Sequence, residues 1–257
     1  MEKKYFFFDI DGTLTDRSTG EIVSSAREAL NRLEANGHFV AIATGRAHYK
    51  ARRFTEANGF KNMVCCGGNG CVINNELVEN IPLDKEGCLQ IIHQAEELGY
   101  GWCAALDDTK DVYMTDDKFL RQVGKRKEPT RYIIDDMLDI DSVDAIYKIY
   151  VAIPKEEEEK LTKKELIGHL RFEPEYLMFQ PDNKRGGIVK MMEHLGADIK
   201  DVVVFGDDYN DMDMFCKDWF SIAMGNGCQD LKDIASYVTD TNVNDGIKKA
   251  CEHFEWI

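Results

Sequence analysis

The sequence predicts an α/β protein in which a doubly wound parallel sheet is interrupted by an inserted α+β module. At both ends of the chain, short apolar runs bounded by Asp, Gly or Thr alternate with amphipathic helical patterns, which is typical of βαβ units. Between them the pattern changes to short strands of the hairpin type. Because 257 residues can form two domains of moderate size, we expect a core domain over 1–81 and 183–257, and an inserted domain over 82–182.

The N-terminal elements predict a βαβ unit. The apolar run 6–8 leads directly into the acidic segment DIDGTLTD, and so short a run suits a strand buried on both faces. Residues 24–36 carry apolar side chains at helical spacing and are followed by glycine, which predicts a capped helix. Strands are predicted over 39–43 and 63–66, the second leading into the glycine-rich loop 67–70. The ends of these strands should open on one edge of the sheet.

The inserted module has a different pattern. Its predicted elements are a helix over 85–98, strands over 102–106 and 112–115 around a turn at 107–110, a strand over 143–153, a charged helix over 155–169, and a strand over 171–180 broken by Pro174. After it the βα alternation returns. The expected elements are a helix over 187–195, a strand over 201–205, and short strands over 220–223 and 237–239.

Composition excludes several classes of protein. Acidic residues number 47 and basic residues 32, and the net charge of −15 repels a nucleic-acid backbone. No apolar run approaches the ~18 residues of a membrane span, and the charged start lacks a signal-peptide pattern, so we expect a cytoplasmic protein without membrane or nucleic-acid partners. The eight cysteines lack CxxC spacing, which favours buried thiols over disulfides or a zinc site.

Polar residues follow the predicted core strands where ligands bind in open α/β sheets. These residues are Asp9 and Asp11, Thr44, Lys184, and the group Asp207, Asn210 and Asp211. Taken alone, Asp9 and Asp11 could simply form a turn, since Asp-Gly is a common turn dipeptide. Together, however, the four carboxylates with one lysine would repel one another unless a cation lies among them. Oxygen ligands without His or Cys favour Mg²⁺.

Such a site suits phosphoryl transfer. A carboxylate can attack phosphorus and form an acyl-phosphate, and Asp9 is our candidate nucleophile. Asp11, two residues further on, could protonate the leaving oxygen and later accept a proton from the attacking water. The Thr44 hydroxyl, loop amides and the Lys184 ammonium suit the equatorial phosphate oxygens.

The segments FFFDIDGTLTD, AIATGR, the lysine of NKRGGIVKMMEHLG, and VVFGDDYNDMDMF resemble the four motifs of the haloacid dehalogenase (HAD) superfamily of phosphatases. The insertion resembles the α/β (C2B-like) cap of the Cof-type members. The resemblance implies a Rossmann-like core, a cap that gates the site, Mg²⁺ as cofactor and an aspartyl-phosphate intermediate. One departure is Arg185, where the family usually has glycine; it could contact substrate or simply face solvent at the start of a helix.

The resemblance also assigns roles to residues. It implies Asp9 as nucleophile and Asp11 as acid/base. Metal ligation falls to Asp9, Asp11 (through its main-chain oxygen), Asp207 and Asp211, and phosphate or substrate binding to Thr44, Gly45, Arg46, Asn69, Lys184 and Asn210. Whether Asn210 or Asp211 contacts the metal directly is left open, and either could cap the next helix. Candidate specificity residues lie in the cap at 107–110 and 176–180.

The hypothesis is a Mg²⁺-dependent phosphomonoester hydrolase of small phosphorylated metabolites, with sugar phosphates or related compounds as substrates, acting as a monomer or weak homo-oligomer. The alternatives are a phosphomutase, a phosphatase dedicated to one sugar phosphate, and a metabolite-binding regulator without turnover. The presence of both Asp9 and Asp11 speaks against the regulator, because binding alone needs neither a nucleophile nor a proton carrier.

Overall fold

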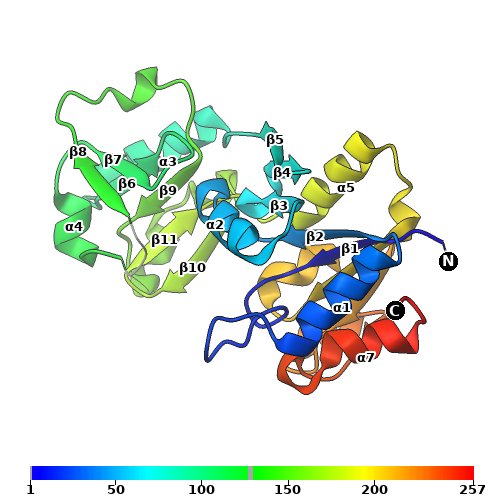
Figure 1. Cartoon of the computed structure of the whole chain (residues 1–257). Coiled ribbons are helices and arrows are strands. Elements are labelled where there is room, and N and C mark those ends of the chain that lie inside the picture. The colour runs from blue at the N-terminus through cyan, green and yellow to red at the C-terminus, as the bar shows by residue number, and fades with distance from the viewer. Residues whose placement is uncertain (1, 127–129) are drawn as a thin grey trace. The chain divides into compact units, whose positions relative to one another are not determined.

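The structure is a computed structural model that describes residues 2–126 and 130–257 (Figure 1). The chain divides into two compact units. The core unit contains residues 1–46, 53–79 and 183–257, and the inserted unit contains residues 47–52 and 80–182. Each unit has its own sheet with flanking helices, which confirms the predicted α/β class.

The core unit is built on an eight-stranded sheet with the order β14-β13-β12-β1-β2-β3-β4-β5. Its strands are β1 (Tyr5–Phe8), β2 (Phe39–Ala43), β3 (Met63–Cys65), β4 (Gly70–Ile73), β5 (Glu76–Asn80), β12 (Val202–Gly206), β13 (Phe220–Ala223) and β14 (Tyr237–Val238). From β14 to β3 all neighbours are parallel, as predicted, whereas β4 runs antiparallel to β3. Strands β4 and β5 were not predicted; they are joined at Asn74 and Asn75, whose positive φ angles suit a tight hairpin.

Helices cover both faces of the core sheet. They are α1 (Ser24–Ala35), α5 (Lys184–Leu195), α6 (Gln229–Ile234) and α7 (Gly246–His253), and α1 lies beside α7 (Figure 1). A further helix, α2 (His48–Asn58), begins in the inserted unit and ends in the core unit. Phe6, Phe7 and Phe8 are fully buried and alternate between the faces. Phe7 packs in the same cluster as Ile188 of α5, whereas the Phe6 ring meets Trp256, beyond α7, edge to face at 5.0 Å. The three aromatic residues of β1 therefore pack into the hydrophobic layers on both faces of the core sheet.

The inserted unit has a six-stranded sheet with the order β10-β11-β9-β6-β7-β8. Its elements are α3 (Lys85–Glu97), β6 (Trp102–Ala105), β7 (Asp111–Met114), α4 (Lys118–Val123), β8 (Arg131–Ile134), β9 (Lys148–Val151), β10 (His169–Glu173) and β11 (Tyr176–Phe179). The predicted hairpin around 107–110 is present, and so is the break at Pro174, which lies in the turn between β10 and β11. No sequence pattern predicted α2, α4 or β8.

The predicted charged helix over 155–169 is wrong. This segment forms two short 3₁₀ turns, Lys155–Lys160 and Lys164–Leu166, and β10 begins at His169. Its glutamates bond to partners in different directions: Glu158 accepts from Arg171 Nε at 2.7 Å, and Glu159 from Lys164 Nζ at 2.6 Å. Since Leu161 is fully buried between the turns, tertiary contacts override the helical propensity of a glutamate-rich run. The predicted strand 143–153 is likewise shortened to β9.

Two sequence expectations concern the whole chain. All eight cysteines lie within the described residues as thiols outside any disulfide, and five of them are buried. Within 2–126 and 130–257, no helix has the combination of length and apolar character that crossing a membrane requires.

Candidate active site

Asp9 and Asp207 are brought together by neighbouring parallel strands. Asp9 follows β1 and Asp207 follows β12, and these strands pair in register with Phe8 opposite Phe205. The Asp9 main-chain N–H donates to the Phe205 carbonyl at 3.0 Å, which continues the ladder to the edge. Both carboxyl groups are nearly inaccessible to solvent, with residue exposures of 5% and 2%. The edge of the sheet thus holds two buried acids from distant parts of the sequence.

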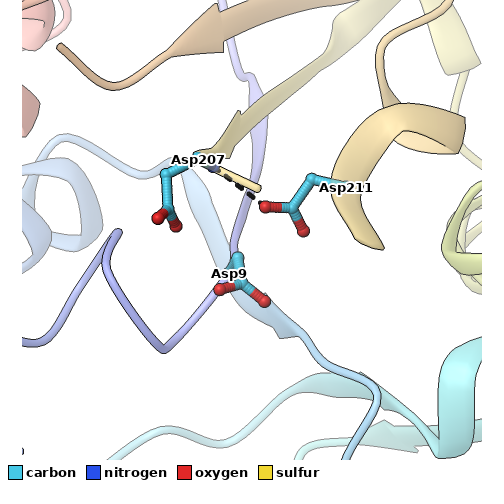
Figure 2. Close-up of side chains that lie close together, drawn as sticks. All are labelled: Asp9, Asp207 and Asp211. Carbon is cyan, nitrogen blue, oxygen red and sulfur yellow. Dashed lines mark hydrogen bonds between the residues drawn. The ribbon is translucent and has the colours of Figure 1, made fainter. Parts of the chain in front are cut away.

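Asp211 is the third acid. It lies on the 3₁₀ helix Tyr209–Met214, and its Oδ2 accepts from the main-chain N–H groups of Asp207 at 2.9 Å and Asp208 at 3.2 Å. A Cβ at Gly206 would come within 2.8 Å of this carboxyl group, so glycine is needed at the end of β12. Figure 2 shows the resulting group of Asp9, Asp207 and Asp211, whose ligand oxygens all lie within 4.8 Å of one another.

Lys184 neutralises two of these acids. It is the first residue of α5 and is 1% exposed, and its Nζ lies 2.8 Å from Asp9 Oδ1 and 2.6 Å from Asp211 Oδ1. The start of α5 is held by Asn183, whose side chain accepts from Gly186 N–H and whose own N–H donates to the Gly67 carbonyl at 2.9 Å. Gly68 has a φ of +106°, and a Cβ there would lie 1.9 Å from the Asn183 carbonyl oxygen. The glycine loop therefore positions the lysine.

Burial and mutual repulsion set the protonation of the site. Burial, reinforced by the nearby Asp211 charge, raises the pKa of Asp9 to about 7. Burial also raises the pKa of Asp207 to about 6, although a hydrogen bond from Thr13 opposes the shift. For Lys184 burial favours the neutral amine, but the carboxylates of Asp211 and Asp9 outweigh it and raise its pKa, so the ammonium form is retained. Three acids and one lysine leave an excess of negative charge.

A divalent cation fits this set of donors. The oxygens of Asp9, Asp207 and Asp211 are close enough to share one ion, and hard carboxylate ligands suit Mg²⁺. When bound, such an ion would supply positive charge that lets a phosphate dianion approach a carboxylate. These three aspartates would hold it.

We expect Mg²⁺ to stabilise the protein more at about pH 8 than at about pH 5. Between the ordinary aspartate pKa of 3.8 and the folded pKa of about 7, native Asp9 keeps a proton that the unfolded chain has lost. Raising the pH through this window therefore lowers the free energy of unfolding of the metal-free protein, and Asp207 acts in the same direction up to about pH 6. Thermal melts in EDTA and in Mg²⁺ across the range measure this. An Mg²⁺-induced shift in Tm that is the same at both pH values would contradict it.

The Asp11 side chain lies outside the group of three acids. It is 65% exposed, and Arg46 Nη2 donates to both of its oxygens at 2.7 and 2.8 Å. Its carboxyl group thus faces the outer side of the site, and metal binding by its main-chain oxygen stays a prediction. Arg46 was predicted to bind substrate. In the structure its side chain is bonded to Asp11, the proposed acid/base.

The remaining predicted residues lie around this edge of the core sheet. Thr44 follows β2 and is buried, and its Oγ1 accepts from the Arg46 main-chain N–H at 3.2 Å across Gly45. Asn69 follows the short turn Cys66–Gly68. Asn210 is half-buried beside Asp211 on the same 3₁₀ helix. Of the two residues left open, Asp211 is therefore the one that joins the acids, while it also takes part in the helix cap.

Two contacting residues were missed by the sequence analysis. Thr13 Oγ1 donates to Asp207 Oδ1 at 2.9 Å, and Arg17 Nη2 lies 2.8 Å from Asp207 Oδ2. Thr13 lies inside the first motif, so its position could have indicated a role in the site. Nothing in the local pattern distinguishes Arg17 from a surface arginine. Arg185 contacts Asp218 and is exposed, in agreement with the solvent-facing alternative.

Comparison with known proteins identifies the family. The model of the haloacid dehalogenase-like hydrolases matches residues 6–251. This chain belongs to that family. The haloacid dehalogenase-like chain is 30% identical over 253 residues to YkrA of Bacillus subtilis (strain 168), with 97% of each protein covered. It is 26% identical over 264 residues to the 5-amino-6-(5-phospho-D-ribitylamino)uracil phosphatase YcsE of the same organism, covering 99% of this chain and 96% of YcsE.

Solved structures agree with this membership. The HAD subclass IIB sugar phosphatase BT4131 superposes with a TM-score of 0.77 at 26% identity, covering 99% of this chain and 100% of the other. The resemblance to the HAD superfamily is thus confirmed, and this haloacid dehalogenase-like hydrolase is an enzyme of the phosphatase type.

Proposed function

We propose that the chain is a Mg²⁺-dependent phosphomonoester hydrolase that acts on small phosphorylated metabolites, sugar phosphates among them, through a phosphoryl group carried on Asp9. The observation that supports this most directly is the arrangement of Lys184 between Asp9 and Asp211, with Asp207 in the same group. One ammonium and three carboxylates at the edge of an open sheet can hold a cation and a phosphate together. The names of YcsE and BT4131, both phosphatases of phosphorylated small molecules, support the substrate class.

The nucleophile is oriented by its lysine. Among the described residues, Lys184 is the only side chain that donates to the Asp9 carboxyl group, and it bonds Oδ1. The second oxygen, Oδ2, remains for attack on phosphorus. In the first step a bond forms from Asp9 to phosphorus, the ester P–O bond breaks, and the leaving oxygen takes a proton from Asp11. In the second step water attacks the same phosphorus, gives its proton to Asp11 and releases inorganic phosphate from Asp9.

Phosphate release tests this proposal. We expect p-nitrophenyl phosphate to be hydrolysed in Mg²⁺ and hydrolysis to stop in EDTA, with recovery when Mg²⁺ is restored. A panel of sugar phosphates, pyridoxal phosphate and phosphoglycolate then measures preference as kcat/KM, with release of inorganic phosphate as the readout. An isomerised phosphate ester in place of free phosphate would identify a mutase. Identical rates in Mg²⁺ and EDTA would contradict the metal requirement.

Asp11→Asn should lower kcat by ~10²–10⁴-fold, the usual contribution of a general acid/base. The asparagine keeps an oxygen that can accept from Arg46, and the main-chain oxygen is unchanged, so the Mg²⁺ concentration needed for half-maximal activity should stay close to that of the wild type. Asp16→Asn, at the last residue of the same motif, is the matched control, because the asparagine can still accept from the Ser18 main-chain N–H. A kcat within a few-fold of the wild-type value would assign the proton transfer to another group.

A further inference from the structure

Arg17 contacts the edge of the three-acid group, although no assigned step uses it. Its Nη2 lies 2.8 Å from Asp207 Oδ2 and 3.0 Å from Asp208 Oδ2. The two carboxyl groups differ in surroundings: Asp207 is buried inside the group, whereas the Asp208 side chain is 43% exposed and lies outside it. One guanidinium nitrogen therefore bridges a proposed metal ligand and a carboxylate that the metal would not use.

This contact occupies Asp207. Thr13 donates to Oδ1 and Arg17 to Oδ2, so both oxygens of the carboxyl group accept a hydrogen bond. The approach depends on Gly12, whose φ is +99°: a Cβ there would lie 2.3 Å from Asp207 Oδ2 and 2.5 Å from Arg17 Nε. The absence of a side chain at residue 12 thus allows the arginine to reach the acid.

The backbone that carries Arg17 is held in a tight turn. Asp16 accepts from the main-chain N–H groups of Thr19 at 3.2 Å and Gly20 at 2.7 Å through its carbonyl, and from Ser18 N–H at 2.8 Å through its side chain. The Arg17 side chain, in contrast, is 59% exposed. A long side chain on a fixed turn can change partner without movement of the loop.

Charge balance determines which partner it takes. When ionised, the three acids carry three negative charges, and Lys184 together with one divalent ion balances them fully. Arg17 then adds a positive charge next to the ion, which is unfavourable at short range. Without the ion, Lys184 alone leaves an excess of negative charge, and Arg17 reduces it.

We infer that Arg17 is a tethered cation that bridges Asp207 and Asp208 while no divalent ion is bound, and that it releases Asp207 and keeps Asp208 when the ion binds. This inference rests on the proposed Mg²⁺ dependence. Arg17 acts as a positioning residue: it keeps Asp207 oriented in the metal-free protein, and it competes with the ion for the same carboxyl group. It therefore lowers the apparent affinity for Mg²⁺, and Asp208 limits that loss by offering the arginine a second site.

Direct titration of the metal tests this release of Asp207. Mg²⁺ binding is measured by calorimetry for the wild type, Arg17→Gln, Asp208→Asn and the double variant. We expect Arg17→Gln to bind Mg²⁺ about 2- to 5-fold more tightly and Asp208→Asn to bind it more weakly by a similar factor. In the Arg17→Gln background, Asp208→Asn should have a clearly smaller effect, because no arginine needs the second site. Asparagine still caps the 3₁₀ helix in the Asp208 variant.

A control arginine and a second measurement distinguish the specific effect of Arg17 on Mg²⁺ affinity from the general effect of removing one positive charge. Arg32→Gln removes a half-exposed arginine that pairs with Glu28 and Glu252, away from the three acids, and should leave Mg²⁺ affinity unchanged. In EDTA, Arg17→Gln should melt at a lower temperature than Arg32→Gln, because buried Asp207 loses its counter-charge.

The possible failures are distinguishable. Equal Mg²⁺ affinities for the wild type and Arg17→Gln would overturn the inference and leave the proposed function intact. Strictly additive effects in the double variant would overturn the retention of Arg17 by Asp208. Absence of Mg²⁺ binding in all four proteins would overturn the inference together with the metal requirement of the proposed function.

Discussion

Asp9→Asn should abolish turnover, with a fall in kcat on the order of 10⁴-fold or more. An amide is a far weaker nucleophile than a carboxylate, and no other described acid has the same relation to Lys184 at the end of β1. Rates are measured by phosphate release in saturating Mg²⁺. Asp218→Asn, an exposed aspartate at the Arg185 pair, is the control for loss of one acidic charge from the core unit. Turnover near the wild-type level would refute Asp9 as the nucleophile.

The same substitution should not unfold the protein. Asparagine has nearly the same shape, and its side-chain oxygen can still accept from Lys184. It also removes one charge from a crowded acidic group, whose repulsion contributes to raising the pKa of Asp9 to about 7. In EDTA at about pH 8, the variant should therefore melt at or above the wild-type temperature. A lower Tm would indicate that the carboxylate stabilises the metal-free fold.

Lys184→Met should both inactivate and destabilise the protein. The lysine is almost completely buried and donates to Asp9 and Asp211, so its removal leaves two buried carboxylates without their shared cation. Breaking a buried pair in this way costs about 3–5 kcal/mol. Urea unfolding at about pH 8 in EDTA measures the loss. The loss should be smaller at about pH 5, where Asp9 is protonated, and smaller when Mg²⁺ is present.

Two further variants separate the effect of charge from that of packing. Lys190→Met, on the same helix, removes a half-exposed lysine that lies 3.6 Å from Glu79, and it should cost little. Combining Lys184→Met with Asp9→Asn removes one of the orphaned charges, so the double variant should recover part of the lost stability. Equal losses for Lys184→Met and Lys190→Met would show that the buried ammonium is not the stabilising group.

Local sequence was enough to predict the parts of the site that lie next to strands. Asp9 and Asp207 each follow an apolar run that predicts a strand. Because parallel strands end at the same edge of a sheet, the sequence predicted that the two acids lie close together, and β1 and β12 do pair in parallel. The predicted helix over 187–195 begins three residues earlier in the structure, and Lys184 lies in its first turn. The positions of these residues at the sheet edge depend on elements that the neighbouring residues specify.

Other features depend on residues that are distant in the sequence. The glutamate-rich segment after Pro154 does not form a long helix, because Arg171 and the burial of Leu161 hold it in short turns. The small strand β4 depends on pairing with β3, and β5 lies beside β4 at the edge of the sheet. The alternation of apolar and polar residues in each is too short to predict a strand by itself. Hydrophobic periodicity contains no information about such partners.

By itself the sequence determined the α/β class, the family and the acids at the ends of β1 and β12, since strand patterns and motif spacing are local properties. Only the tertiary structure decided that Asp211 completes the group while Asp11 turns outward to Arg46, and that Thr13 and Arg17 occupy the two oxygens of Asp207. The physical reason is that the direction of a side chain depends on the charges and donors that folding brings near it, and for Asp207 these come from residues 194 and 190 positions away in the sequence.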